Sequence, residues 1–189
     1  APPPTASVAA PHPGSVGVTD PALRALLEEH WDATMASHPS WATSLGDHRF
    51  DDQLGDNSLD AGDAFLERQR GWLAAARALD GLDADDALDR DLFAGSLETA
   101  IEVAACRMGA WTVSPRMNAL IAVASIRRDH PAATVDDAVH LLARYQQAPT
   151  WVDRDIANLR TGLAEGRVAN ARSVALTVEM IRAELGGGL

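Results

Sequence analysis

"TDPALRALLEEHWDATMAS" (Thr19–Ser37) carries the pattern that decides the fold class. Asp20 can cap a helix, and Pro21 follows in the first turn, where its missing N–H costs no hydrogen bond. Apolar side chains then recur at spacings of three and four residues, at Leu23, Leu26, Leu27, Trp31 and Met35. This period places them on one face of a helix. Pro39 predicts that the helix ends near Ser37.

The same period recurs along the rest of the chain. It predicts helices over about 59–79, 86–108, 116–128, 135–147, 151–163 and 174–185. Ser58 and Thr134 are the expected caps of two of them, and Asp137 completes a shortened capping box with Thr134. Pro149 is expected to separate two helices. Because no stretch shows the alternation of a strand, we predict an all-α fold, an irregular bundle of six to seven antiparallel helices with short loops.

Several apolar residues are expected to lie in the core of this bundle. The helical stripes place inward Leu88, Leu92, Val139 and Leu142, and the sole cysteine, Cys106, lies in an apolar stretch typical of a buried small residue. The tryptophans are also expected in the core: Trp31, Trp41, Trp72, Trp111 and Trp151.

Composition limits the classes of partner. The chain has 189 residues, which suits one domain or one lobe of a larger protein. Its 27 acidic and 16 basic residues give a formal net charge of −11. That balance argues against binding nucleic acid or docking on an anionic membrane, since both need a basic surface. No apolar run is long enough for a membrane span.

The first 18 residues differ in composition from the remainder. They are rich in Pro, Ala, Ser and Gly, and predict a disordered leader or linker at 1–18, ahead of a helical lobe at 19–189. Such a segment is typical of the region just after a cleaved signal or a lipid anchor. We therefore predict a periplasmic or secreted location, with lipid anchoring as one form of it, and a cytoplasmic location as the alternative.

"HPSWATSLGDHRFDDQLGDNS" (His38–Ser58) lies between two predicted helices and has no sustained period. It lacks the residue order of a calcium loop, and His48 with Asp51 or Asp52 gives only part of a zinc site. Adjacent carboxylates such as Asp51 and Asp52 also diverge, which argues against a carboxylate-based hydrolase. Two interpretations remain open. One is a structural loop pinned to the core by Trp41, Leu45, Phe50 and Leu54, and the other is the rim of a substrate cleft.

The candidate rim residues are Trp41, His48, Asp51, Asp52, Arg127 and Arg128. The two arginines have guanidinium groups that fit a substrate carboxylate. Their alternative role is simpler, because cations are favoured at the C-terminus of a helix. No residue is assigned as catalytic or as a metal ligand.

Two stretches of the chain resemble the bacterial family called domain of unknown function 885. The first matches at Pro39, Ala42-Thr43, Leu45-Gly46, Phe50-Asp51 and Asp56-Asn57-Ser58. The second matches at Tyr145, Pro149, Gly162, Gly166 and Arg167, with Asn170 where the family often has Pro. Together they cover about 19–185.

This resemblance implies more than the chain contains. Members are typically longer and helical, and look like zinc peptidases with a His-Glu-x-x-Pro-Gly-His motif in their C-terminal part, where histidines hold the metal and Glu activates water. None of the 6 histidines here is followed by Glu. The resemblance therefore implies the N-terminal helical lobe of a metal-dependent peptidase or hydrolase, inactive alone. Zinc belongs only to the full-length family, and the partners are a C-terminal catalytic lobe and a peptide substrate.

The alternative is a stand-alone helical module that binds a peptide or a protein. An incomplete lobe should expose an apolar face, whereas a true module should unfold cooperatively as a monomer.

Overall fold

The structure, a computed structural model, describes residues 12–186 and is all-α, as predicted. Within this range no β-strand forms. Three short 3-10 helices are present: η1 (Pro13–Ser15), η2 (His48–Phe50) and η3 (Met108–Ala110). The same range contains seven α-helices: α1 (Pro21–Ser37), α2 (Pro39–Ser44), α3 (Leu59–Ala78), α4 (Ala84–Ala104), α5 (Ala119–Asp129), α6 (Val135–Ala164) and α7 (Ala171–Gly186).

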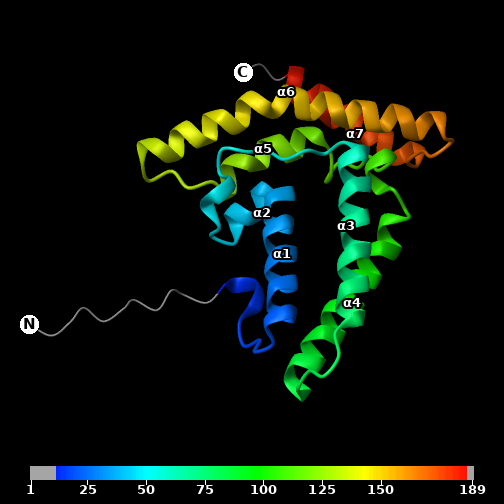
Figure 1. Cartoon of the computed structure of the whole chain (residues 1–189). Coiled ribbons are helices and arrows are strands. Elements are labelled where there is room, and N and C mark those ends of the chain that lie inside the picture. Colours follow the sequence, from blue (N-terminus) through cyan, green and yellow to red (C-terminus); the bar gives the residue numbers. More distant parts are fainter. Residues whose placement is uncertain (1–11, 187–189) are drawn as a thin grey trace, which may run out of the picture.

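The helices form a stem and a crossbar (Figure 1). Helices α1, α3 and α4 make the stem, and the long α6 lies across one end of it, with α5 packed against α6. The short α2 joins the top of α1 to the crossbar through α5. No helix between residues 12 and 186 is both long and apolar enough to cross a membrane.

The apolar core lies in the stem. It is a cluster of buried residues from three helices: Ala33, Trp72, Ala76, Phe93 and Leu97. The ring of His30 contacts Trp72 and Phe93 edge-on, with both centroid distances at 5.0 Å. Burial, and secondarily the charge of Arg68, lowers the pKa of His30, so the neutral ring is favoured as part of this cluster.

The predicted helix caps are confirmed. Asp20 accepts hydrogen bonds from two backbone N–H groups at the start of α1. Ser58 accepts one from Ala61 N at the start of α3. Thr134 and Asp137 form the reciprocal capping box of α6. Local capping chemistry therefore sets where these helices begin.

The predicted course of α4 needs two corrections. The helix ends at Ala104, so Cys106 lies in the following turn and is exposed rather than buried. Leu88 and Leu92 are 59% and 64% exposed. Helix α3 packs on the other side of α4, where Phe93 and Leu97 are four residues apart and buried.

Pro149 does not end a helix, because α6 runs through it as a single helix of 30 residues. A proline inside a helix removes one hydrogen bond, and contacts on both sides of it must hold the two halves in line. The predicted inner residues Val139 and Leu142 are exposed. The buried residues of α6 are Arg144, Ala148, Asn158 and Gly162, so the two large side chains among them are polar.

Three further predictions differ from the structure. Part of the 38–58 stretch is helical, as α2 and η2. Trp72 is the buried tryptophan, whereas Trp41 and Leu45 are each 50% exposed and do not pin the stretch to the core. Residues 1–11 of the predicted leader lie outside the described residues, but residues 12–18 pack on α1, with Val18 buried.

Candidate functional site

Arg144 of α6 is the centre of a buried polar network. Its side chain is 1% exposed. Its Nη2 donates to Thr43 Oγ1 at 2.6 Å and to the Phe50 carbonyl at 2.9 Å. Asp51, also buried, has Oδ1 3.6 Å from the same nitrogen and accepts from Thr43 Oγ1 at 2.5 Å. Burial lowers the pKa of Arg144, and the nearby carboxylates act in the opposite direction.

Two histidines extend this network. His130 is buried, and its Nε2 lies 2.8 Å from the Asp137 carbonyl. A carbonyl only accepts, so Nε2 carries the proton and Nδ1 accepts from Arg144 Nη1 at 3.2 Å. On the other side, His48 Nδ1 lies 2.9 Å from Asp51 Oδ2. The network thus ties η2 to α6 and to the α5–α6 connection.

The same face of α6 holds the chain between η2 and α3. Gln147 Nε2 donates to the Asp52 carbonyl at 2.7 Å. Asn158 is buried, donates to the Asn57 carbonyl at 2.7 Å and accepts from Leu59 N at 3.2 Å. These polar side chains of α6 satisfy backbone groups of the facing segment. The segment 50–59 is therefore fixed from several points on one helix.

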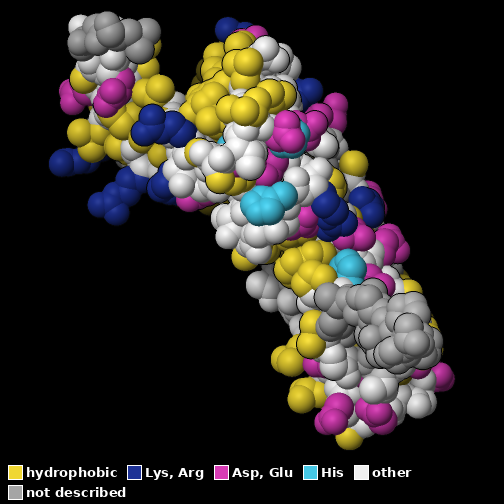
Figure 2. Space-filling model, turned by 90° about the vertical axis from the view of Figure 1, so that its left-hand side faces the viewer, with side chains coloured by type: hydrophobic (Ala, Val, Ile, Leu, Met, Phe, Trp, Pro, Cys, Tyr) yellow, Lys and Arg dark blue, Asp and Glu magenta, His cyan; other side chains and the backbone are white. Residues whose placement is uncertain are grey.

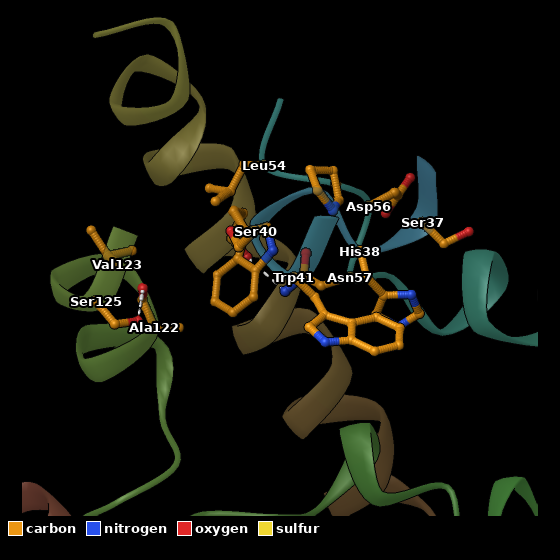
Figure 3. Close-up of a pocket in the computed structure, with 13 residues that line it drawn as sticks. Ser37, His38, Ser40, Trp41, Leu54, Asp56, Asn57, Ala122, Val123 and Ser125 are labelled. Atoms are coloured by element: carbon orange, nitrogen blue, oxygen red, sulfur yellow. Dashed lines mark hydrogen bonds between the residues drawn. The ribbon is translucent and has the colours of Figure 1, made fainter. Parts of the chain in front are cut away.

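A pocket of about 400 Å³ lies beside this segment (Figure 3). Ala122, Val123 and Ser125 of α5 form one wall, and Figure 3 shows them across the pocket from Leu54. The remaining lining residues come from the α1–α2 junction, the segment before α3, and α6: Ser37, His38, Pro39, Ser40, Trp41, Gly55, Asp56, Asn57 and Trp151.

Two more pockets adjoin the first. One, of about 400 Å³, shares Ala122 and Trp151 with it and lies between η3, α5 and α6. The other, of about 270 Å³, shares Asp56 and Asn57 with the first pocket and Gly109 with the second. The shared residues show that the three pockets lie next to one another, and together we call them the α5–α6 groove.

Unpartnered polar atoms gather along this groove. Asn57 Oδ1, Arg107 Nε and Thr112 Oγ1 are buried without a hydrogen-bond partner, and each residue lines at least one of the three pockets. Arg107 also has a φ of 45°, a left-handed conformation that is uncommon for residues other than glycine. Buried unpaired groups and strained backbone are costly, and both are typical of functional sites.

Asp155 lines the second pocket of the groove from α6. Its carboxylate is half-buried and makes no hydrogen bond or ion pair with any other residue in the 12–186 range. Burial raises the pKa of Asp155, because the carboxylate loses water and no ion pair offsets that loss. Arg116 lines the same pocket but is exposed.

The predicted rim residues fall into three places. Trp41 lines the groove. His48 and Asp51 contact each other in the Arg144 network. Asp52 is exposed, and its backbone carbonyl accepts a hydrogen bond from Gln147. The remaining two, Arg127 and Arg128, are exposed in the last turn of α5, where Arg128 pairs with its neighbour Asp129. The structure therefore does not bring the six together, and the rim remains a prediction.

Sequence reasoning missed Arg144, Asn158 and Asp155. Polar residues within a helix usually face water, so nothing local marks these as buried. The one available signal was Pro149, whose survival inside α6 requires strong contacts on both sides of it.

The described residues do not fit a zinc site. Between residues 12 and 186 there is no group of three or more His, Cys, Asp or Glu side chains that could hold a metal ion. The zinc that the resemblance implies for full-length family members thus has no ligand set among these residues.

Fold and site together define an all-α protein with a surface groove, next to a segment that polar side chains of α6 hold in place. The model of the family described as "Bacterial protein of unknown function (DUF885)" matches residues 39–187, and the chain belongs to this family. No curated protein matches the chain. The matched range includes both the segment 50–59 and the α6 side chains that hold it.

Proposed function

We propose that this chain is the N-terminal helical lobe of a metal-dependent peptidase or related hydrolase. In that protein it forms one wall of the substrate cleft and supplies no metal ligand. The observation that carries the proposal is the α5–α6 groove, which combines apolar walls with unpartnered polar atoms. Such a lining can hold a peptide by its side chains and leave polar groups to fix its orientation.

Exposed apolar side chains support an incomplete lobe. Val135, Val139 and Leu142 share one face of α6 and are 80%, 58% and 58% exposed. Figure 2 shows hydrophobic side chains gathered at the crossbar end of the molecule. An apolar stripe on a helix is normally covered, so we assign this face to contact with a C-terminal catalytic lobe.

The proposal is tested on the purified chain and on its gene. We expect no stoichiometric zinc by elemental analysis and no cleavage of a fluorogenic peptide library. An open reading frame that continues past Leu189 to a His-Glu-x-x-Pro-Gly-His motif would support the proposal. Chelator-sensitive peptide hydrolysis by residues 1–189 alone would overturn it.

A second candidate function is a stand-alone peptide-binding or protein-binding module. The observation that favours it is that core, polar network and groove all form within this one chain. The two candidates differ in solution behaviour: a stand-alone module should be monomeric and unfold in one cooperative step, without binding a hydrophobic dye. In either case we propose a periplasmic or secreted location, from the composition of the first 18 residues.

A further inference from the structure

We propose that the second pocket of the α5–α6 groove binds the side chain of a lysine or arginine in a peptide, with Asp155 as the anion that recognises it. We call it the Asp155 pocket, after the carboxylate that lines it from α6. This inference rests on the proposed function, because it assigns a side-chain preference to the groove that would hold the substrate.

The walls of the Asp155 pocket suit a long aliphatic stem. Met108 of η3, Met117 of the turn before α5 and Ile121 of α5 line it, and their side chains are apolar. Trp151 lines it as well and is half-buried. The volume of about 400 Å³ accommodates one long side chain. Lysine and arginine bury their stems on apolar surface while the charged head seeks a polar partner.

The carboxylate of Asp155 is unpaired in this pocket, because Arg116, the basic residue of the lining, is exposed and forms no ion pair with it. Asp155 makes no hydrogen bond or ion pair with any residue in the range 12–186, and its partial burial makes the unpaired carboxylate costly. A ligand ammonium or guanidinium would remove this cost by donating hydrogen bonds to the carboxylate. The indole of Trp151 also favours a cation over its face.

Charge and shape together select this occupant over its rivals. A metal ion would need three or more ligands, and none of the groups formed by residues 12–186 supplies them. A peptide's N-terminal ammonium lacks the stem that the apolar walls would cover. The net charge of −11 also draws basic peptides toward the molecule and repels acidic ones.

The test uses the whole chain and four labelled peptides of one sequence. They carry lysine, arginine, norleucine or glutamate at a single position, and binding is followed by fluorescence anisotropy at low salt. We expect lysine and arginine to bind about tenfold tighter than norleucine, the effect of one charge-assisted hydrogen bond. Asp155→Asn should abolish this preference.

The matched control is Asp153→Asn, an exposed aspartate two residues away on the same helix, which should keep the preference. Both variants keep side-chain size, and a thermal melt of each confirms folding. Equal binding of the lysine and norleucine peptides by the native chain would overturn the inference but not the proposed function. Peptide hydrolysis by the isolated chain would overturn the proposed function but leave the preference measurable.

Discussion

Two regions hold the molecule together in different ways. One is the apolar core of the stem, and the other is the polar contact between α6 and the segment 50–59, which we call the α6 interface. In the stem, apolar residues such as Phe93 and Leu97 pack against each other and need no particular partner. At the interface, Arg144 and Asp51 are buried with their charges and depend on specific atoms. The first region stabilises the fold through area removed from water. The second stabilises one position of the segment 50–59.

This difference has a consequence for function. A buried ion pair is a poor source of net stability, because desolvation offsets most of its attraction. Its value here is positional, since the segment that Arg144 holds continues into the wall of the groove at Leu54 and Asn57. We therefore expect damage at the interface to affect both stability and binding, and damage in the stem to affect stability alone.

The largest effect is expected from Arg144→Met. Removing the cation takes the buried guanidinium away from Asp51, and it also removes the hydrogen bonds from Arg144 to the Phe50 and Gln53 carbonyls. We expect the free energy of unfolding to fall by about 4 kcal/mol, measured by urea denaturation.

A double variant that combines Arg144→Met with Asp51→Leu measures the interaction between the two buried charges. If the pair holds the segment in this way, the two changes together should cost less than the sum of the single changes, because no buried charge is left alone. An Arg144→Met variant with the stability and peptide binding of the native chain would show that the network does not position the segment.

Leu97→Ala is the corresponding change in the stem. Leu97 is 1% exposed, so the change creates a cavity and should cost about 3 kcal/mol. Leu92→Ala on the same helix is the matched control, and its cost should stay below about 0.5 kcal/mol because Leu92 is exposed. Peptide affinity of the folded Leu97→Ala chain should equal that of the native chain. A lower affinity would mean that the stem also shapes the groove.

The sequence predicted the stem better than the crossbar for a physical reason. Helical periodicity reports apolar faces, and the α1 stripe with Leu23 and Met35 is buried as expected. The same rule failed on α6, because its buried face carries Arg144 and Asn158 and its apolar stripe faces outward. A buried polar residue is recognised by partners far along the chain, and periodicity contains no information about them. The groove depends on those partners, so only Trp41 among the predicted rim residues lines it.

A smaller effect is expected where the crossbar meets η3. A Cβ on Gly162 would lie 1.8 Å from the Ala110 carbonyl oxygen, which is backbone and cannot rotate away. Gly162→Ala should therefore lower the free energy of unfolding by about 2 kcal/mol, although alanine in place of glycine usually stabilises a helix.

Gly71→Ala in α3 tests the same exchange in open space. A Cβ there meets nothing within 4 Å, so we expect a gain of about 1 kcal/mol. Thermal melts of the two variants should thus shift in opposite directions. A stabilised Gly162→Ala chain would mean that α6 and η3 do not approach this closely.

The smallest effect distinguishes paired from unpaired carboxylates. Asp86 accepts hydrogen bonds from the Thr19 hydroxyl, Thr19 N and Asp20 N, and these hold the pKa of Asp86 below its usual 3.8. Asp155 has a pKa shifted the other way, by burial. Asp86 therefore stabilises the fold above the unfolded-state pKa, and this stability is lost as the pH falls through its folded-state pKa. For Asp155 the favourable contribution is present below the unfolded-state pKa and is lost as the pH rises through the folded-state pKa.

The two asparagine variants should consequently show opposite pH dependence in urea titrations from the acid range to neutrality. The free energy of unfolding of the Asp155→Asn chain should rise relative to that of the native chain as the pH rises, by less than about 1 kcal/mol at neutral pH. Asp86→Asn should be less stable than the native chain at neutral pH, with the deficit shrinking in acid. If the Asp155→Asn difference does not vary with pH, the carboxylate is already paired, and the pocket has no unpaired carboxylate to select a basic side chain. If the difference varies with pH as expected, the ionised carboxylate of Asp155 destabilises the free chain, and a bound cationic ligand would remove that destabilisation.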